Sequence, residues 1–329
     1  GLPYCNVSKP PTTARKGFKD SMQDNYILIS PCKNEEAYIE RTLQSILNQT
    51  IKPSQWVIVD DGSTDRSVEI IDAYRDRMPF IKVVSRDTKE RRVGAGVIMA
   101  FNEGLAHVDV EDYQFLCKFD VDLDLHDSYF ETLLKRMDAD PTLGTCSGKA
   151  YYMHPKTDAR ISELCGDEAS VGMTKFYRRT CFEQIGGFVA EVGWDGYDCH
   201  RARWFGWRAM SWDDPEALQF IHLRPMGSSQ KSIFAGRVRH GKGQFHQGTH
   251  PLFFLISSLY RSVKQKPYVI GTVFSIYGYV KAYLSGEKRF GDRDMIKFVR
   301  SYQMRALRMG KGKAAEWAVQ QRRIHLAAL

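Results

Sequence analysis

The chain has 329 residues, of which 43% are hydrophobic and 26% charged, an ordinary globular composition. It is long enough for one large domain with an extension or for two domains, so size sets no obstacle to a full hydrophobic core. The formal net charge of +8 is uneven, because residues 285–329 contain 11 Lys or Arg and 4 Asp or Glu, a net +7, which leaves +1 for the first 284 residues.

Seven cysteines are scattered along the chain, odd in number and without a C-x-x-C pair or a Cys/His cluster. This spacing argues against a disulfide framework and against a structural zinc site, and it fits a reducing cytoplasm. The first residues include no initiating Met and no apolar segment, so we expect no signal peptide and interpret residues 1–24 as a tail.

The first half of the chain alternates short apolar runs with helical patterns. Residues 26–30 (YILIS) predict a strand, and apolar residues recur at helical spacing over 39–47. Residues 55–59 (QWVIV) predict a second strand, after which Ser63 or Thr64 is placed to cap the next helix.

Two further strands are predicted at residues 80–85 and 113–119, with an apolar helix between them from Val97 to about His107. Continuous apolar strands separated by helices are typical of a mostly parallel sheet that helices cover on both faces. We therefore predict an α/β fold in which ligands bind at the carboxyl ends of the strands.

Polar residues follow each predicted strand, and the rim of the sheet should bring them together. They are Pro31, Asn34 and Glu35 after the first strand, Asp60 and Asp61 after the second, Arg91, Arg92 and Gly94 beyond the third, and Asp120 and Asp122 after the fourth. For any one of these positions ordinary turn chemistry is an equal alternative, because strand ends favour the same residue types.

The turn SPCKNEE after the first strand contains no glycine, so it is not the G-x-G-x-x-G turn of dinucleotide-binding folds, and no P-loop pattern is present. Carboxylates would repel a phosphate unless a cation lay between them, and Mg²⁺ or Mn²⁺ suits carboxylate and phosphate oxygens. Asp120 and Asp122, at alternate positions of a strand end, can point at one such ion. Asp124 is expected to be a helix cap or a solvent-facing acid.

The ordered set P-x-x-N-E, V-D-D-G-S-T-D and F-D-x-D over residues 25–225 resembles the family 2 glycosyltransferases, which have the GT-A fold. The resemblance implies that Pro31, Asn34, Glu35, Asp61 and Asp60 hold the nucleoside, and that Arg91 or Arg92 faces the base or diphosphate. It also implies that Asp120 contacts the ribose or donor sugar and that Asp122 binds the metal, Mn²⁺ or Mg²⁺.

A fifth strand is predicted within residues 144–153, and residues 172–207 resemble the acceptor segment of the same family. Where the family has a Glu-Asp pair, this chain has Trp194 and Asp195, so the resemblance implies Asp195 as the catalytic base, with Asp198 as the alternative. Burial beside Trp194 would raise the pKa of such a carboxylate. The alternative interpretation, which we favour less, is that Asp195 is a helix N-cap.

His222 ends an apolar run, and the resemblance implies a possible third metal ligand there, although a structural histidine is the commoner case. In the segment GRVRHGKGQFHQGTHPL that follows, basic and imidazole side chains lie among glycines, and those that matter here are Arg237, Arg239, His240, Lys242 and His246. This composition predicts one of two alternatives, a phosphate-wrapping loop or a flexible basic loop.

Residues 251–260 and 267–284 are the most apolar stretches, and neither has the run of about 20 apolar residues that spans a bilayer. They predict interfacial or packed helices. Residues 288–323 interleave apolar residues with cations, which predicts an anchor on anionic lipid, so we expect residues 251–323 to contact a membrane. The alternative is that these helices pack back on the domain. No nucleic-acid-reading motif accompanies the charge.

The resemblance implies an inverting glycosyltransferase that uses a nucleotide sugar, by default a UDP-sugar. The expected acceptor is a lipid-linked saccharide in bacterial surface polysaccharide assembly, at the cytoplasmic face of the cell membrane. The expected division is a tail (1–24), a GT-A domain (25–230) and a helical extension (231–329). A nucleotidyltransferase and a catalytically silent nucleotide-sugar-binding module are the alternatives.

Overall fold

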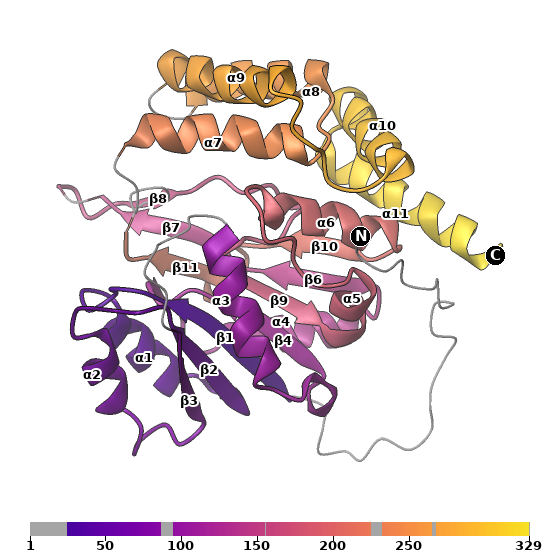
Figure 1. Cartoon of the computed structure of the whole chain (residues 1–329). Helices are drawn as coiled ribbons and strands as arrows, with labels where there is room; N and C mark the ends of the chain where they lie inside the picture. Colours follow the sequence, from indigo (N-terminus) through magenta and orange to yellow (C-terminus); the bar gives the residue numbers. More distant parts are fainter. Residues whose placement is uncertain (1–24, 87–94, 155, 225–231, 265–267, 329) are drawn as a thin grey trace.

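The computed structural model describes residues 25–86, 95–154, 156–224, 232–264 and 268–328 (Figure 1). The predicted tail and the predicted ligands Arg91 and Arg92, with Gly94, lie outside the described residues. The six described cysteines are free thiols.

A seven-stranded sheet forms the centre of the protein. Its order is β10-β6-β9-β4-β1-β2-β3, and β9 alone of these described strands runs antiparallel to its neighbours. The predicted mostly parallel α/β fold is therefore confirmed. The strands are β1 (Tyr26–Cys32), β2 (Gln55–Asp60), β3 (Ile81–Ser85), β4 (Phe115–Phe119), β6 (Leu143–Ser147), β9 (Thr174–Arg178) and β10 (Arg208–Ser211).

Helices cover both faces of this sheet because successive strand residues point to opposite sides. Leu28 packs in a core with Leu43 of α1, whereas Ile27 and Ile29 pack in a second core with Phe101 of α3. The first face carries α1 (Ile39–Leu47), α2 (Ser67–Asp72) and α4 (Tyr129–Ala139), and the second carries α3 (Ala95–Ala106), α5 (Arg179–Gln184) and α6 (Trp194–Trp204). Short 3-10 turns span η2 (Val110–Asp112) and η3 (Glu216–Leu218).

The predicted cap of α2 is wrong. The helix begins at Ser67, whose backbone N–H and hydroxyl both donate to the carboxylate of Asp65. Ser63 and Thr64 lie in the preceding loop, where both bind Asn34.

The predicted fifth strand is divided at Gly148 between two sheets. β6 ends at Ser147, and β7 (Lys149–Met153) joins β5 (Leu123–Asp124), β11 (Gln219–His222) and β8 (Arg160–Ser162) in a four-stranded sheet of order β5-β11-β7-β8. A Cβ atom at position 148 would lie 2.1 Å from the carbonyl oxygen of Leu218, so the turn between the two sheets requires glycine.

Five helices follow among the described residues. They are α7 (Ile233–His246), α8 (Pro251–Lys264), α9 (Tyr268–Leu284), α10 (Arg293–Met309) and α11 (Lys311–Ala327). In Figure 1, α7, α8 and α9 lie above the sheets, with α7 between the sheets and α9, whereas α10 and α11 lie to the right, next to α6. No described helix is both long and apolar enough to cross a membrane.

The segment expected as a basic loop is the helix α7, so both predicted loops are wrong. Its glycine at 241 and that of α9 at 278 let the two backbones touch. A Cβ on Gly241 would lie 1.8 Å from the carbonyl oxygen of Ser275, and one on Gly278 would lie 2.0 Å from that of Val238. Tight packing between α7 and α9 therefore explains these glycines, which do not mark a flexible loop.

The apolar face of α10 packs on the domain. Met295 and Val299 are buried in one cluster with Tyr197 of α6. The guanidinium groups of Arg322 and Arg323 in α11 donate to the carbonyl oxygens of Trp204 and Gly206, each at 2.7 Å. For this part of 251–323 the structure shows the packed alternative, and nearly all of the exposed large apolar side chains of 251–323 lie instead on α8 and α9.

Candidate active site

The loops after β1 and β2 are tied together. Asn34 has the left-handed φ of 56° that asparagine tolerates; its N–H donates to the Ser63 hydroxyl at 3.0 Å, and its side-chain oxygen accepts from Thr64 N–H at 2.8 Å. In the strand register, Cys32 lies opposite Asp60 and Pro31 opposite Val59. The structure thus brings Pro31, Asn34, Glu35, Asp60 and Asp61 to one edge of the sheet. Asn34 connects the two loops through its hydrogen bonds.

The two acids after β2 differ in their surroundings. Asp60 is buried and accepts from Ser63 N–H at 3.0 Å. The Asp61 carboxylate lies 3.2 Å from the guanidinium of Arg86, the residue that directly follows β3. We had not predicted Arg86, although its position as the first cation after a strand was a usable signal.

Asp120 and Asp122 lie in the bend beyond β4, not in the strand itself. Asp120 pairs with the buried Lys118, and its backbone N–H donates to Met173. Burial, opposed by Lys118 and reinforced by Asp122, raises the pKa of Asp120. Asp124 is neither a helix cap nor a free acid, because it lies in β5 and pairs with Arg41 at 2.7 Å.

Asp122 is buried at the meeting point of two strands. Leu223 N–H donates to its carbonyl oxygen, its Oδ2 lies 3.3 Å from His222 Nε2, and Arg224 Nε lies 2.6 Å from the same oxygen. Burial alone would raise the pKa of Asp122, but the hydrogen bond from His222 and the charge of Arg224 hold it below the ordinary value. The structure thus places His222 beside Asp122 and adds Arg224, which sequence reasoning missed.

Two further acids complete this cluster. The Glu163 carboxylate lies 3.0 Å from His222 Nδ1, and Arg224 Nη2 donates to Glu35 at 2.7 Å. Burial disfavours the charged imidazole, but the hydrogen bonds to Asp122 and Glu163 raise the pKa of His222 to about 9. Burial raises the pKa of Glu35 to about 7 against the opposing charge of Arg224.

The donor set fits a divalent cation that a diphosphate helps to bind. No three metal-ligating side chains form a ready cluster among the described residues. Mg²⁺ and its relatives do not need one, because they bind through one or two carboxylates together with substrate phosphates. Asp122 and His222 can supply two ligands. The Glu163 carboxylate lies at Nδ1 of His222, the ring nitrogen that does not face Asp122, and a carboxylate in this position commonly orients a metal-bound histidine.

The two candidate bases on α6 differ in accessibility. Asp198 is buried, and its carboxylate accepts from Lys175 at 2.7 and 2.6 Å, from Cys199 N–H and from the Tyr177 hydroxyl. Asp195, in the first turn of α6, is exposed. A base must reach its substrate, so the geometry favours Asp195.

The expected burial of Asp195 beside Trp194 is wrong, since Trp194 is buried but Asp195 is not. The Trp194 ring instead faces two lysines, with Lys118 Nζ at 5.5 Å and Lys175 Nζ at 5.8 Å from its centroid. Since Lys118 also pairs with Asp120, this ring connects the acidic bend to the start of α6.

α7 closes over the start of α6. A Cβ on Gly193 would lie 3.0 Å from the Cα of Gly243. On the same helix, Arg239 has a buried Nη1 with no hydrogen-bond partner among the described residues. Burial lowers the pKa of Arg239, whereas the charge of Asp195 raises it, so the two side chains are electrostatic neighbours.

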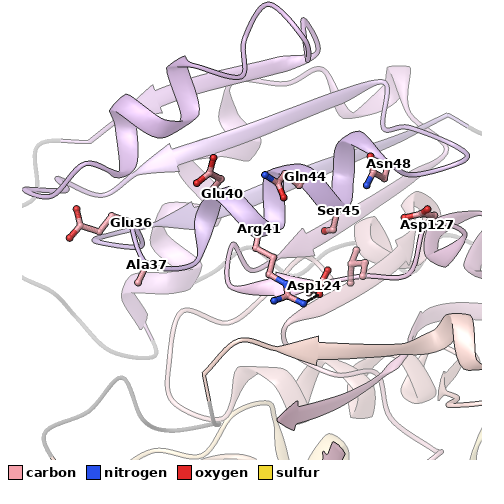
Figure 2. Close-up of a pocket in the computed structure, with 10 residues that line it drawn as sticks. Glu36, Ala37, Glu40, Arg41, Gln44, Ser45, Asn48, Asp124 and Asp127 are labelled. Carbon is pink, nitrogen blue, oxygen red and sulfur yellow. Dashed lines mark hydrogen bonds and ion pairs between the residues drawn. The ribbon is translucent and has the colours of Figure 1, made fainter. Parts of the chain in front are cut away.

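A separate surface groove runs along α1 and is bounded by the Arg41–Asp124 ion pair (Figure 2). None of its ten described lining residues is a predicted site residue. They are Glu36, Ala37, Glu40, Arg41, Gln44, Ser45, Asn48, Asp124, Leu125 and Asp127.

Comparison with known proteins gives the same assignment for the first part of the chain. A family model described as glycosyl transferase family 2 matches residues 27–192. The chain is 27% identical over 201 residues to glycosyltransferase GlyA of Streptococcus pneumoniae serotype 4, over 54% of this chain and 27% of GlyA. The chain therefore spans only about a quarter of that curated relative.

Two solved structures share the fold at low identity. One is S. aureus TarS 1–349 in complex with UDP-GlcNAc, with a TM-score of 0.52, 14% identity and 92% of both chains covered. The other is the mannosyltransferase PcManGT from Pyrobaculum calidifontis in complex with GDP-Man and Mn²⁺, with a TM-score of 0.50, 19% identity and coverage of 91% of this chain and 87% of that one. The predicted GT-A fold is confirmed, and the chain belongs to glycosyl transferase family 2.

Proposed function

We propose that this chain transfers a sugar from a nucleoside-diphosphate sugar to an acceptor hydroxyl, with inversion at the anomeric carbon. The observation that carries the proposal is the convergence on Arg224. This side chain, directly after β11, binds both Glu35 after β1 and Asp122 after β4. Residues from three distant loops thus form one charged site at the carboxyl edge of the sheet, where α/β sheets bind ligands.

The nucleoside is proposed to bind at the joined loops after β1 and β2. Polar side chains there can hold the base and ribose, and Arg86 beside Asp61 provides a cation among the described residues. Asp120 is proposed to contact the ribose or donor sugar. The residues on the nucleoside side are Pro31, Asn34, Glu35, Asp60 and Asp61, and Arg91 or Arg92 remains proposed for the base or diphosphate.

The proposed metal ligands are Asp122 and His222, with Mn²⁺ or Mg²⁺ as the ion. When bound, the ion would supply positive charge opposite the departing diphosphate. Support comes from the Asp122–His222–Glu163 arrangement and from the structural neighbour PcManGT, which was solved with GDP-Man and Mn²⁺. A UDP-sugar is the proposed donor, and the TarS complex with UDP-GlcNAc supports this choice.

Asp195 is proposed to take the proton from the attacking hydroxyl. It is exposed at the start of α6, and Lys175 fixes its backbone by donating to its carbonyl oxygen at 2.7 Å. Lys175 also binds the carboxylate of the buried Asp198. Asp198 therefore helps to hold the helix turn that carries the exposed Asp195.

The test is the Asp195→Asn variant assayed with a panel of nucleotide sugars and Mn²⁺. We expect transfer to fall by about 10²- to 10⁴-fold, the usual contribution of general-base catalysis. Nucleotide binding and the melting temperature should not change. Near-normal turnover by a folded Asp195→Asn protein would show that the base is another group.

The acceptor is proposed to be a lipid-linked saccharide, presented at the cytoplasmic face of the cell membrane during bacterial surface polysaccharide assembly. The support is the apolar surface of α8 and α9. Leu259 and Val263 of α8 and Val269 and Val273 of α9 are each more than half exposed. Such a surface on the layer above the active site favours an interface with lipid.

A further inference from the structure

Arg239 of α7 is a cation without an ion-pair partner among the described residues, and its Nη1 is buried without a hydrogen-bond acceptor there. α7 itself contains no Asp or Glu. A buried N–H group with no acceptor costs free energy, and the cost is larger when the group is charged. The side chain as a whole is only partly buried, so a ligand can reach the guanidinium group.

Contacts between α7 and α6 fix the place of Arg239 relative to the proposed base. Gln247, which follows α7, donates to the carbonyl oxygen of Gly193 at 2.7 Å, and Gly193 precedes α6. A Cβ on Gly243 would lie 3.2 Å from the Cα of Gly193. Arg239 lies one turn before Gly243 on the same face of α7, and Asp195 lies in the first turn of α6. The two helices therefore hold Arg239 near Asp195.

Arg239 and Asp195 are neighbours without being partners. The charge of Asp195 acts on the pKa of Arg239, yet no ion pair joins these two described side chains. An ion pair would lower the pKa of the carboxylate and weaken it as a proton acceptor. Both groups thus remain available to one ligand, the carboxylate for a hydroxyl and the guanidinium for an anion.

Two glycines keep side chains away from these groups. A Cβ on Gly236, three residues before Arg239 in α7, would meet no described atom within 4 Å. Gly172 lies against Asp195, where a Cβ would be 3.3 Å from Oδ2 of the carboxylate. A larger side chain at either position would extend into the space beside the arginine or the base.

The donor side of the site already has its own cations. Arg224 binds Asp122 and Glu35 there, and the proposed metal ion would add further positive charge. Of the described carboxylates, Asp195 acts on the charge of Arg239, whereas Asp122 and Glu35 do not. Arg239 therefore belongs to the acceptor side of the site.

We propose that Arg239 binds an anionic group of the acceptor, a phosphate ester or a carboxylate, close to the hydroxyl from which Asp195 takes the proton. Guanidinium N–H groups donate in pairs to carboxylate and phosphate oxygens. A bound anion gives Nη1 its missing acceptor, whereas a neutral sugar leaves the positive charge unbalanced. This inference rests on the proposed function and narrows its acceptor to an anionic saccharide.

Stability separates a binding role of Arg239 from a structural one. Arg239→Gln removes a partly buried charge that has no partner, so the melting temperature of the ligand-free protein should stay the same or rise. If Arg239 only held α7 on the domain, the same variant would melt at a lower temperature, and this result would overturn the proposal.

The binding test uses the full chain with UDP and Mg²⁺ present, so that the donor site is occupied, and nuclear magnetic resonance titration as the readout. The probes are glucose 1-phosphate, glucuronic acid and the neutral methyl glucoside, with their galactose counterparts measured alongside. The parent should bind the anionic probes about tenfold more tightly than the neutral one. The better anionic probe identifies the group as phosphate or carboxylate.

Three variants assign the anion to Arg239. Arg239→Gln should bind the anionic probes about tenfold more weakly and the neutral probes unchanged. Arg239→Lys keeps the charge but loses the paired donors, so its affinity should lie between the two. Arg308→Gln, the same substitution at an exposed position of α10, is the matched control and should stay within about twofold of the parent.

A separate UDP titration tests whether Arg239 binds the donor diphosphate instead. Arg239→Gln should bind UDP within about twofold of the parent, and a loss of about tenfold would place the arginine on the donor and overturn the proposal. Equal losses for anionic and neutral probes, or no binding of any anionic probe to the parent, would overturn it as well.

The binding measurements do not depend on transfer. A chain that binds anionic sugars through Arg239 but transfers no sugar would reject the proposed function alone. A chain that transfers sugar equally well to neutral and anionic acceptors, with or without Arg239→Gln, would reject this inference alone.

Discussion

Arg224 Nε lies 2.6 Å from Oδ2 of Asp122, the carboxylate proposed to hold the metal. The guanidinium therefore occupies the oxygen that a divalent cation would bind. Arg224 also binds Glu35 at 2.7 Å and lies 5.4 Å from the ring centroid of Tyr38, so it has alternative contacts when it leaves Asp122. Metal and arginine should compete for one carboxylate.

Removal of this competitor should strengthen metal binding. We expect Arg224→Gln to bind Mn²⁺ about tenfold more tightly in the absence of nucleotide, because a hydrogen bond to a charged group contributes about 1.5–3 kcal/mol. Electron paramagnetic resonance of free Mn²⁺ measures this. Arg160→Gln, which breaks an exposed pair with Glu216, is the control. Unchanged or weaker Mn²⁺ binding by Arg224→Gln would contradict the competition.

Glu163 should act through His222. Its carboxylate lies 3.0 Å from Nδ1 and so orients Nε2 toward Asp122. We expect Glu163→Gln to weaken Mn²⁺ binding by about 10- to 100-fold, the usual cost of losing such a supporting acid. The measurement is Mn²⁺ titration in the presence of nucleoside diphosphate. Glu216→Gln should leave the affinity unchanged, and an equal effect of both variants would mean that Glu163 contributes only its charge.

Much of the proposed nucleotide-sugar site could be predicted from the sequence, because each of its residues lies close in sequence to the strand that positions it. Each of the first four strands is a mostly apolar run. Asp60 ends β2 and Asp61 follows it, and Asp120 and Asp122 come one and three residues after β4. Their convergence follows from the parallel arrangement alone.

The rest of the site depends on contacts that no local pattern carries. Glu35 and Arg224 are 189 residues apart in sequence, and they meet only because β11 pairs with β5 in the second sheet. Likewise, Asp195 and Asp198 can be distinguished as candidate bases only by their burial. The sequence around them does not show this difference, because the groups that bind the Asp198 carboxylate, Lys175 and Tyr177, belong to β9. In α7 the glycine-rich composition predicted a loop, but close packing on α9 stabilises a helix.

The pair of Lys175 and Asp198 should be important for folding. Lys175 is fully buried, and its Nζ lies 2.6 Å from the Asp198 carboxylate. Asp198→Asn leaves the ammonium without a counter-ion, so we expect a loss of about 3 kcal/mol or more in the free energy of unfolding. Urea unfolding measures it. Asp195→Asn is the matched control and should unfold like the parent protein. If the two variants unfolded alike, the pair would not stabilise the fold.

His200 should make the protein acid-sensitive. Burial, with the charge of Arg203, lowers the pKa of His200 to about 3 from its usual 6.5. Between these values the unfolded chain binds a proton that the folded one does not, so stability falls as the pH drops below 6.5. The slope approaches about 1.4 kcal/mol per pH unit.

The variant His200→Gln removes this titration and keeps an acceptor for Arg203, which donates to Nδ1 at 3.2 Å. Its free energy of unfolding should fall less steeply between pH 6.5 and pH 3 than that of the parent. His325→Gln, at an exposed position of α11, is the control. Parallel pH profiles for His200→Gln and the parent would show that His200 does not carry the effect.

The apolar surface of α8 and α9 should govern attachment to lipid. Leu259 and Val263 are exposed at 55% and 67%, so Leu259→Gln/Val263→Gln should fold normally. Transfer of each side chain into the interface is worth about 1.5–3 kcal/mol when complete, so we expect vesicle binding to fall by about tenfold or more per substitution. Sedimentation with vesicles of phosphatidylcholine and phosphatidylglycerol measures it.

The matched control carries Leu164→Gln and Ile324→Gln, two apolar side chains that are each 59% exposed outside α8 and α9. This control should sediment like the parent. Binding of the parent should also weaken as salt is raised. The 70 residues between Glu216 and Glu287 contain nine Lys or Arg and no Asp or Glu, and these cations attract the anionic headgroups through a field that salt screens. If the parent failed to sediment at low salt, or if both double variants lost binding equally, α8 and α9 would not be the lipid-binding surface.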